Sequence, residues 1–433
     1  MTKRYLTVFL LVLLIAGTNA FAGGGREAGG EPGVVQLTFR QNDPPAEVAG
    51  LMEAIADWNR ENPGIQVRSE NVPWADALNQ FIREGQASGG PDVLQLAFVW
   101  TADLGRAELV MNLDEIVRTS PPGAGIDDFL GTDLGEVEGS LFGIPWTVDT
   151  FVMAYRPDLF ADAGVSGFPD TWEAFYRTVR DLTRDTNGDG RVNQYGFGFP
   201  AGSASGGGMW FLANYYLWSN GATFVEQRND GTWQIGATAD QVAATMRYFN
   251  RFFTEGLTPA SMIGVNSWGD PELTGGLSRG DIAISFFPPG TFRAAQSQAD
   301  MPLATAMIPR GSQRRISHLG GRALAINANT EHPEESWEFL KYLIGRGVFE
   351  RYQQFPAQET LLSELVFPES EQGYADQLPH AITLKQYIES PAPVSGLWDA
   401  TNREFAAVFS GQKNETRAAA DLLAAMEQLL QNN

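Results

Sequence analysis

The order of strand-like and helix-like segments near the start of the chain constrains the fold most strongly. Residues 34–40, 65–72 and 91–98 have the apolar or alternating composition of strands. Residues 46–62 and 74–88 carry apolar side chains at helical spacing. A β-α-β-α-β order with about 30 residues per unit predicts a parallel sheet with right-handed crossovers. We therefore expect an α/β fold.

The carboxyl ends of these strands are the first place to expect a ligand, because open parallel sheets bind ligands at that edge. Asn42 and Asp43 follow the first strand, Trp74 follows the second, and Trp100 follows the third. We expect these four side chains to lie near a binding site. Aromatic rings at two of three strand ends indicate a ligand with an apolar face.

A second α/β region follows the first. Its expected strands are residues 195–200, 281–287 and 321–328, and its expected helices are residues 172–183, 209–222, 239–256, 332–354 and 416–430. The chain shows no internal repeat and no long linker. Two lobes, if present, are therefore expected to share strands or chain crossings.

The N-terminus has the pattern of a secretory signal peptide over residues 1–22. Lys3 and Arg4 precede an apolar stretch at 6–15, and a small-x-small cleavage pattern lies at 20–22. An uncleaved membrane anchor is the alternative. Residues 23–33 are expected to form a flexible leader. The chain has no Cys, so we expect no lipid anchor and no disulfide. Cleavage of the signal peptide would leave the mature protein in the periplasm, which is the location that we expect.

The charge of the chain argues against some partners. It carries 52 acidic and 30 basic residues, a net charge of −22, which repels nucleic acid and anionic lipid. After residue 22 no stretch of 18 residues is apolar enough for a transmembrane helix. The charge says nothing direct about a neutral ligand.

Catalytic motifs give little support for an enzyme. The three His have no zinc-helix spacing, and the chain has neither a G-x-S-x-G elbow nor a phosphate-binding G-x-x-x-x-G-K. Acids are abundant, so a glycosidase pair stays open, with Asp149, Glu173, Asp270 and Asp281 as candidates. A secreted carbohydrate-active enzyme is therefore kept as an alternative.

Five ordered blocks make the sequence more specific. They are G-x-P-D-V (89–93), L-x-G-I-P-W-x-x-D (141–149), Y-R-P-D-L-F (155–160), P-x-T-W-E-x-F (169–175) and G-x-x-L-A-I-N…H-P-E-E-S-W-E-F-L (321–340). In this order they resemble the extracellular solute-binding proteins of carbohydrate ABC transporters, the group that includes maltose-binding protein. The resemblance spans roughly residues 34 to 360.

The resemblance implies a two-lobed periplasmic-binding-protein fold, with a hinge of several crossings and a ligand cleft between the lobes. The expected N-terminal lobe is 34–147 plus 286–328, and the expected C-terminal lobe is 148–285 plus 329–433. The implied function is the periplasmic substrate-binding component of an ABC importer. It would bind a neutral mono- or oligosaccharide by lobe closure, without catalysis, and deliver it to membrane permease subunits. A glycerol phosphodiester or a peptide is the alternative cargo, and we expect a monomer.

The resemblance also implies site residues, since a sugar needs an aromatic face and a rim of polar groups. Trp146 and Asp149 fall where the chain crosses between lobes, although a buried Trp with a surface Asp is the alternative. Arg322 is expected to bond hydroxyls or an acidic sugar. The other implied ligand residues are Trp100, Asp103, Trp210, Trp268, Phe287, Gly290, Gly321 and Trp398.

One loop, residues 185–196, resembles a calcium-binding loop. Asp185, Asn187, Asp189, the Arg191 carbonyl and Asn193 could supply oxygen ligands to calcium. The twelfth position is Gly rather than the bidentate Glu, so a tight polar turn without metal is the alternative. We expect no required cofactor, and in either case the loop is incidental to ligand binding.

Overall fold

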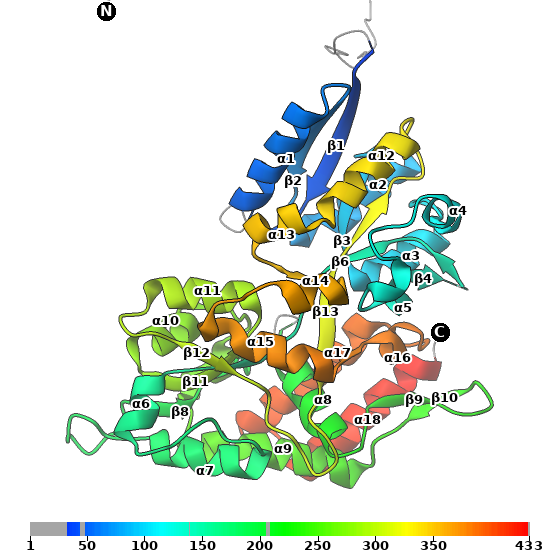
Figure 1. Cartoon of the computed structure of the whole chain (residues 1–433). Coiled ribbons are helices and arrows are strands. Elements are labelled where there is room, and N and C mark those ends of the chain that lie inside the picture. Colours follow the sequence, from blue (N-terminus) through cyan, green and yellow to red (C-terminus); the bar gives the residue numbers. More distant parts are fainter. Residues whose placement is uncertain (1–32, 44–47, 138, 205–207, 432–433) are drawn as a thin grey trace, which may run out of the picture.

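The computed structural model describes residues 33–43, 48–137, 139–204 and 208–431. The predicted signal peptide and nearly all of the leader lie outside these residues. The described chain forms two lobes, one above the other in Figure 1, each built around its own β-sheet with helices packed on it. No helix of the described chain has both the length and the apolar character needed to cross a membrane.

The sheet of the N-terminal lobe contains the predicted β-α-β-α-β unit. Its strand order is β14 (Phe355–Pro356), β6 (Ile144–Asp149), β13 (Ser317–Ile326), β3 (Val93–Ala97), β1 (Val35–Gln41) and β2 (Ile65–Asn71), with β15 (Ala381–Thr383) paired to β13. Strand β1 is parallel to both β2 and β3, as predicted, and β13 runs antiparallel to β3 and β6. The crossovers are α1 (Ala49–Glu61) and α2 (Trp74–Gln86).

The C-terminal lobe has a smaller sheet. Its order is β12 (Ala304–Ala306), β7 (Val152–Tyr155), β11 (Ile282–Phe287) and β8 (Tyr195–Phe197). Two small hairpin sheets pair β4 (Glu136–Val137) with β5 (Ser140–Leu141) and β9 (Val225–Gln227) with β10 (Trp233–Ile235). The predicted strands 195–200 and 281–287 are thus confirmed, the first in a shorter form.

Helices cover both sheets. Besides α1 and α2 they are α3 (Phe98–Arg106), α4 (Asp114–Thr119), α5 (Thr132–Gly135), α6 (Pro157–Asp162), α7 (Trp172–Leu182), α8 (Met209–Ser219), α9 (Ala239–Thr254), α10 (Pro271–Arg279), α11 (Pro289–Gln298), α12 (Pro333–Leu343), α13 (Arg346–Tyr352), α14 (Glu359–Glu364), α15 (Gln372–Gln377), α16 (Lys385–Ile388), α17 (Val394–Phe409) and α18 (Glu415–Gln431). The predicted helices at 172–183, 209–222, 239–256 and 416–430 are α7, α8, α9 and α18.

The predicted helix over 332–354 is wrong as a single element. It divides into α12 and α13 at Gly345, which has an extended backbone. The Trp146 indole N–H donates to the Leu343 carbonyl at 2.9 Å, so a side chain from β6 satisfies one of the free carbonyls at the end of α12. Helical periodicity alone could not show this tertiary contact.

The predicted lobe boundaries differ from the strand pairing in two places. Residues 304–306 were expected in the N-terminal lobe, but β12 pairs with β7 of the second sheet. Helices α12 and α13 were expected in the C-terminal lobe, but they pack on α1, where the Tyr342 hydroxyl donates to the Ala54 carbonyl at 2.7 Å. Strand β14 then pairs with β6. The chain therefore crosses between the lobes as often as the predicted division requires, but it re-enters the N-terminal lobe after β12 and leaves it again only after β14.

Strand β13 is the element that ties the lobes together. Its first residues pair with β15, and its later residues pair with β6 and β3. Figure 1 shows β13 running from the lower lobe into the upper sheet. The strand begins at Ser317 rather than at the predicted 321, because β15 supplies a partner for residues 317–319.

Candidate ligand-binding site

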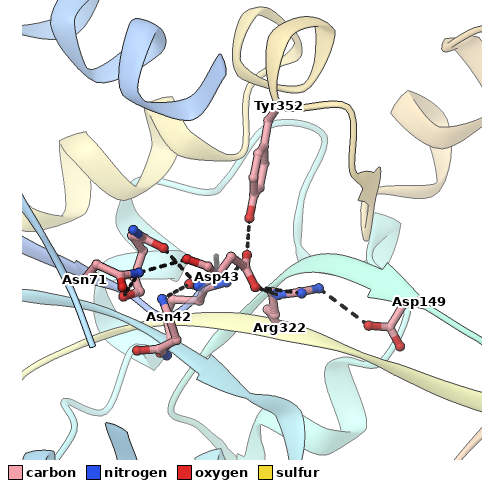
Figure 2. A network of polar contacts seen from close by, with 8 residues as sticks. Asn42, Asp43, Asn71, Asp149, Arg322 and Tyr352 are labelled. Atoms are coloured by element: carbon pink, nitrogen blue, oxygen red, sulfur yellow. Dashed lines mark hydrogen bonds and ion pairs between the residues drawn. The ribbon is translucent and has the colours of Figure 1, made fainter. Parts of the chain in front are cut away.

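A network of polar side chains lies where β1 ends, close to β6 and β13 (Figure 2). Asp43, fully buried, is at its centre. One carboxylate oxygen accepts from Arg322 Nε at 3.0 Å and Nη2 at 2.7 Å. The other accepts from the Tyr352 hydroxyl at 2.5 Å and from Gln95 Nε2 at 2.8 Å. Both oxygens of this carboxylate are therefore occupied by donors from the protein.

The network keeps Asp43 ionised. Burial alone would raise its pKa, but the Arg322 charge and the hydrogen bonds from Tyr352 and Gln95 outweigh burial and lower the pKa below its ordinary value. A buried carboxylate is tolerated only when it is paired and hydrogen-bonded in this way. Asp43 therefore acts as a fixed negative charge that positions Arg322.

The neighbouring amides hold the chain after β1 in place. The Asn42 backbone N–H donates to Gln95 Oε1 at 2.7 Å, and Asn42 Nδ2 donates to the Gln95 carbonyl at 2.8 Å. Asn71 Nδ2 donates to the Asp43 carbonyl at 2.8 Å. Within the described part of the chain, Asn42 Oδ1 is buried and has no hydrogen-bond partner. Asn42 and Asp43 thus belong to one network at the end of β1, and their contact with a ligand stays a prediction.

Asp149 lies at the end of β6, on the other side of Arg322 (Figure 2). Arg322 Nη1 is 3.5 Å from Asp149 Oδ2, so one guanidinium contacts carboxylates from two strands. Burial raises the pKa of Asp149, the Arg322 charge opposes that effect, and the Asp43 charge adds to it. The Asp149 side chain is 25% exposed, whereas the Asp43 side chain is 0% exposed. Asp149 is therefore the carboxylate of the network that a ligand can reach.

Two glycines let β13 approach β6 beside Asp149. A Cβ on Gly321 would lie 2.1 Å from the Thr147 carbonyl, and the Gly321 φ of 148° lies in a region that favours glycine. A Cβ on Gly320 would lie 2.4 Å from Asp149 Oδ1. Gly321 therefore supports the site through its backbone and not through a side chain.

A group of aromatic rings lies on the C-terminal-lobe side of β13. We call Phe151, Phe211, Trp268, His318 and Trp398 the aromatic cluster. Phe211 is at its centre, with ring centroids 4.5 Å from His318, 5.0 Å from Trp398 and 5.6 Å from Trp268. Trp268 and Trp398 are only half-buried. Two of the predicted tryptophans are thus brought together, with part of their surface open to a ligand.

Two other predicted tryptophans lie behind these surfaces. Trp146 is 1% exposed, and its ring stacks on Tyr352 at 5.1 Å. It supports the tyrosine that bonds Asp43, which matches the alternative of a buried Trp. Trp210 is fully buried and stacks on Trp398 at 6.3 Å. In this structure neither ring can contact a ligand directly.

The structure places other predicted residues away from both groups. Trp100 is half-buried in α3 and packs on a small apolar cluster with Phe81 and Leu94. Asp103 is 78% exposed and pairs with Arg106. Trp74 begins α2, but its side chain lies outside the described part of the structure.

Of the predicted pair Phe287 and Gly290, the aromatic residue does not face the aromatic cluster. Phe287 is buried, and its carbonyl accepts from the Tyr374 hydroxyl at 2.9 Å. Side chains alternate along β11, so Phe286 faces the aromatic cluster instead. Its ring centroid lies 5.7 Å from that of Phe151. Gly290 lies in the first turn of α11.

The predicted calcium loop is exposed and closes on its own backbone. Asp185 accepts from the N–H groups of Gly188 and Gly190, both at 2.7 Å, and these bonds lower its pKa. Asn187, Asp189 and Asn193 accept backbone N–H groups within the loop. Among the described residues, no group of three or more His, Cys, Asp or Glu is arranged to hold a metal. Calcium binding by this loop, with the Arg191 carbonyl, stays a prediction.

The acids considered for a glycosidase pair are spread over the surface. Glu173 is exposed on α7, Asp270 accepts the Glu272 N–H at the start of α10, and Asp281 pairs with Arg279. Only Asp149 belongs to the polar network. The structure therefore does not bring these four carboxylates to one place.

Several residues of the site carried no recognised signal in the sequence. Tyr352, Phe151, Phe211 and His318 lie in segments that were assigned only as helix, strand or linking chain. Gln95 had a usable signal, because it is the one polar residue inside the apolar strand Val93–Ala97. A polar side chain in a buried strand needs a hydrogen-bond partner, and here the partners are Asn42 and Asp43.

Two α/β lobes, several crossings and a polar network beside aromatic rings define a two-lobed binding protein. The chain belongs to the bacterial extracellular solute-binding protein family, whose model matches residues 42–348.

Known relatives agree with this assignment. The chain is 24% identical over 399 residues to the maltooligosaccharide ABC transporter solute-binding lipoprotein of Streptococcus pneumoniae (strain ATCC BAA-255 / R6), covering 88% of this chain and 86% of the relative. It is 22% identical over 387 residues to the galactooligosaccharide-binding protein of Bacillus subtilis (strain 168), covering 85% and 84%.

Solved structures share the fold. The sugar-binding protein MalE from Xanthomonas citri superposes with a TM-score of 0.76 at 19% identity, covering 92% of this chain and 98% of that one. The GacH receptor of Streptomyces glaucescens GLA.O gives a TM-score of 0.75 at 21% identity, covering 92% and 99%. This likeness confirms the predicted two-lobed fold.

Proposed function

We propose that the chain is the substrate-binding component of an ABC importer and binds a neutral mono- or oligosaccharide between its lobes. One observation carries the proposal: β13 brings the polar network and the aromatic cluster together, with Arg322 in the first and His318 in the second. Hydroxyl-bonding groups beside aromatic rings that keep part of their surface open are what a sugar requires. The relatives named for maltooligosaccharide and galactooligosaccharide, and the receptor solved with acarbose, support this class of cargo.

The charges of the network favour an uncharged cargo. Arg322 is the cation of the site, and Asp43 and Asp149 both contact it. Arg40, buried near the end of β1, pairs with Glu70 and Glu84, each at 2.6 Å. Both arginines are therefore already compensated, which disfavours a glycerol phosphodiester.

The remaining parts of the proposal concern the cell. The family is extracellular, and the pattern of residues 1–22 supports export to the periplasm through a cleaved signal peptide. We propose membrane permease subunits as the partner, a monomeric carrier without lipid anchor, no catalysis and no required cofactor. Binding would stabilise a closed arrangement of the lobes by its differential affinity for that state.

A thermal-shift screen of the exported chain tests the proposal. The probes are maltotriose, galactotriose, arabinotriose, glycerophosphocholine and a neutral tripeptide. A sugar at 100 times its dissociation constant should add about 2.7 kcal/mol to the free energy of unfolding. We expect a melting rise with one sugar class and recovery of the sugar unchanged.

Other outcomes of the screen contradict the proposal in distinct ways. A rise in melting temperature only with the phosphodiester or the peptide would agree with the family assignment but exclude a sugar as the cargo. Conversion of a sugar into products would favour the carbohydrate-active enzyme, and chromatography of the recovered ligand detects it.

A further inference from the structure

His318 is a buried residue of β13 with a defined environment. Its Nδ1 lies 2.5 Å from the Tyr215 hydroxyl oxygen. Its ring packs on Phe211 at 4.5 Å and edge-to-face on Phe151 at 5.0 Å. These contacts come from α8 and from Phe151, the residue before β7, and they fix the orientation of the imidazole.

The hydrogen bond to Tyr215 determines which ring nitrogen carries the proton. Burial raises the pKa of Tyr215 well above its ordinary value, so the hydroxyl stays protonated. Tyr215 is fully buried, and its O–H would be left unsatisfied unless it donates to His318 Nδ1. Burial also lowers the pKa of His318 to about 3, so the ring is neutral near neutral pH. A neutral imidazole that accepts at Nδ1 carries its N–H at Nε2.

His318 Nε2 and Asp149 Oδ1 both lie beside Gly320. His318 Nε2 lies 3.0 Å, and Asp149 Oδ1 2.4 Å, from the position that a Cβ on Gly320 would take. Among the described residues, neither atom has a hydrogen-bond partner, since Asp149 contacts Arg322 through Oδ2. A donor of the aromatic cluster, with its tautomer fixed, therefore lies within about 5.4 Å of an acceptor of the polar network.

We propose that His318 Nε2 and Asp149 Oδ1 hold one hydroxyl group of the cargo between them, with Tyr215 fixing the donor tautomer. His318 donates a hydrogen bond to the hydroxyl oxygen, and the hydroxyl donates a hydrogen bond to Asp149 Oδ1. An ammonium group cannot accept from His318, and an ether or carbonyl oxygen cannot donate to Asp149. The pair therefore selects a hydroxyl over an amino or deoxy group at one position. This inference rests on the proposed function.

The test compares variants of the exported chain with the same three trisaccharides. His318→Phe keeps the ring packing and removes the donor. Tyr215→Phe removes the group that fixes the tautomer. The double variant Tyr215→Phe/His318→Phe removes both buried polar partners and keeps a folded reference if His318→Phe alone is unstable. His380→Phe, an exposed histidine on η4 (Leu378–His380), is the matched control.

Calorimetry gives the first readout. For the trisaccharide that binds the wild type, the dissociation constant should rise about 10- to 100-fold in His318→Phe and in the double variant, and about 2- to 10-fold in Tyr215→Phe. In His380→Phe it should stay unchanged. Of the singly deoxygenated analogues of that sugar, one should bind the wild type more weakly than the parent sugar does. The His318→Phe substitution should not weaken the binding of that analogue further.

Nitrogen NMR of ¹⁵N-histidine gives the second readout, and the chain has only three histidines to assign. Nε2–H should be the His318 tautomer in the wild type, and its shift should move when the sugar binds. Equal affinity in wild type and His318→Phe, or an Nδ1–H tautomer, would overturn the inference while the sugar still binds. Failure of every trisaccharide to bind the wild type would instead contradict the proposed function and, with it, this inference.

Discussion

At the scale of single residues, Arg322 is the side chain on which the site depends most. It lies 16% exposed between Asp43, which is fully buried, and Asp149. Removing one partner of such a pair leaves a buried charge without compensation, which costs far more than the pair itself contributes.

We therefore expect Arg322→Met to lower the free energy of unfolding by about 3–5 kcal/mol, measured by urea denaturation at neutral pH. Arg279→Met is the matched control. Its ion pair with Asp281 is exposed at 62% and 53%, and the loss should stay below about 1 kcal/mol. Similar losses in both variants would show that the Asp43 pair is not the buried contact described above.

Asp149 should behave in the opposite way to Asp43. Its pKa is raised by burial, so its charged form is disfavoured in the folded protein and costs stability at neutral pH. Asp149→Asn should therefore leave stability unchanged or higher at pH 7 while weakening sugar binding at least 10-fold. Urea unfolding and calorimetry on the same preparation measure both. A variant that loses stability but keeps its affinity would make Asp149 a structural residue.

The lowered pKa of Asp43 predicts a dependence of stability on pH. A carboxyl whose folded pKa lies below its unfolded value of about 3.9 stabilises the fold above that value. The contribution is lost as pH falls through the folded pKa. The stability difference between wild type and Asp43→Asn should thus be largest near pH 6 and shrink below about pH 4. A difference that is constant from pH 6 to pH 2.5 would contradict the assignment.

At the scale of elements, β13 must approach β6 closely, and Gly321 makes that approach possible. Gly321→Ala would place a methyl group 2.1 Å from the Thr147 carbonyl at a φ unfavourable for alanine. We expect a loss of at least about 2 kcal/mol in the free energy of unfolding.

Gly347→Ala in α13 is the control for this variant. A Cβ there meets nothing within 4 Å, and the free energy of unfolding should rise by about 0.4–1 kcal/mol. Thermal unfolding of the two proteins side by side checks both signs. An unchanged Gly321→Ala protein would show that the β13–β6 register is looser than described.

Elements with strong local periodicity could be predicted from the sequence, and elements defined by long-range contacts could not. Helices α1, α2 and α9 and strands β1 to β3 follow from apolar spacing. At the break between α12 and α13, the last turn of α12 receives a hydrogen bond from the indole of Trp146, which is far away in sequence. The register around Phe286 and Phe287 depends on which face of β11 meets the cluster, and two adjacent phenylalanines carry no pattern that decides it.

At the scale of the whole molecule, the sequence analysis selected residues that the structure places in two neighbouring groups. The polar network contains Asn42, Asp43, Asp149 and Arg322, and the aromatic cluster contains Trp268 and Trp398. The resemblance could not separate an exposed tryptophan from a buried one, because Trp146 and Trp268 differ only in what packs over them. The predicted lobe boundary after β13 was wrong, because the helical patterns of the following segments do not show which of the two sheets those helices pack on.

Lobe closure is a prediction at this scale. If a sugar binds between the polar network and the aromatic cluster, the radius of gyration from small-angle X-ray scattering should fall at saturating sugar. Asp149→Asn at a sugar concentration that saturates only the wild type should keep the ligand-free radius. An unchanged radius in the saturated wild type would mean that binding does not need the lobes to move.

The position of β13 in the chain also sets the order in which the molecule can fold during synthesis. This strand fills the place between β6 and β3, yet a ribosome makes it only after every strand of the second sheet. Until then β3 and β6 each have an open edge, and the N-terminal lobe cannot close its core. A nascent chain of this kind stays without its native fold until late in translation. That delay would keep the polypeptide unfolded, which is the state that the proposed export through a secretion channel requires.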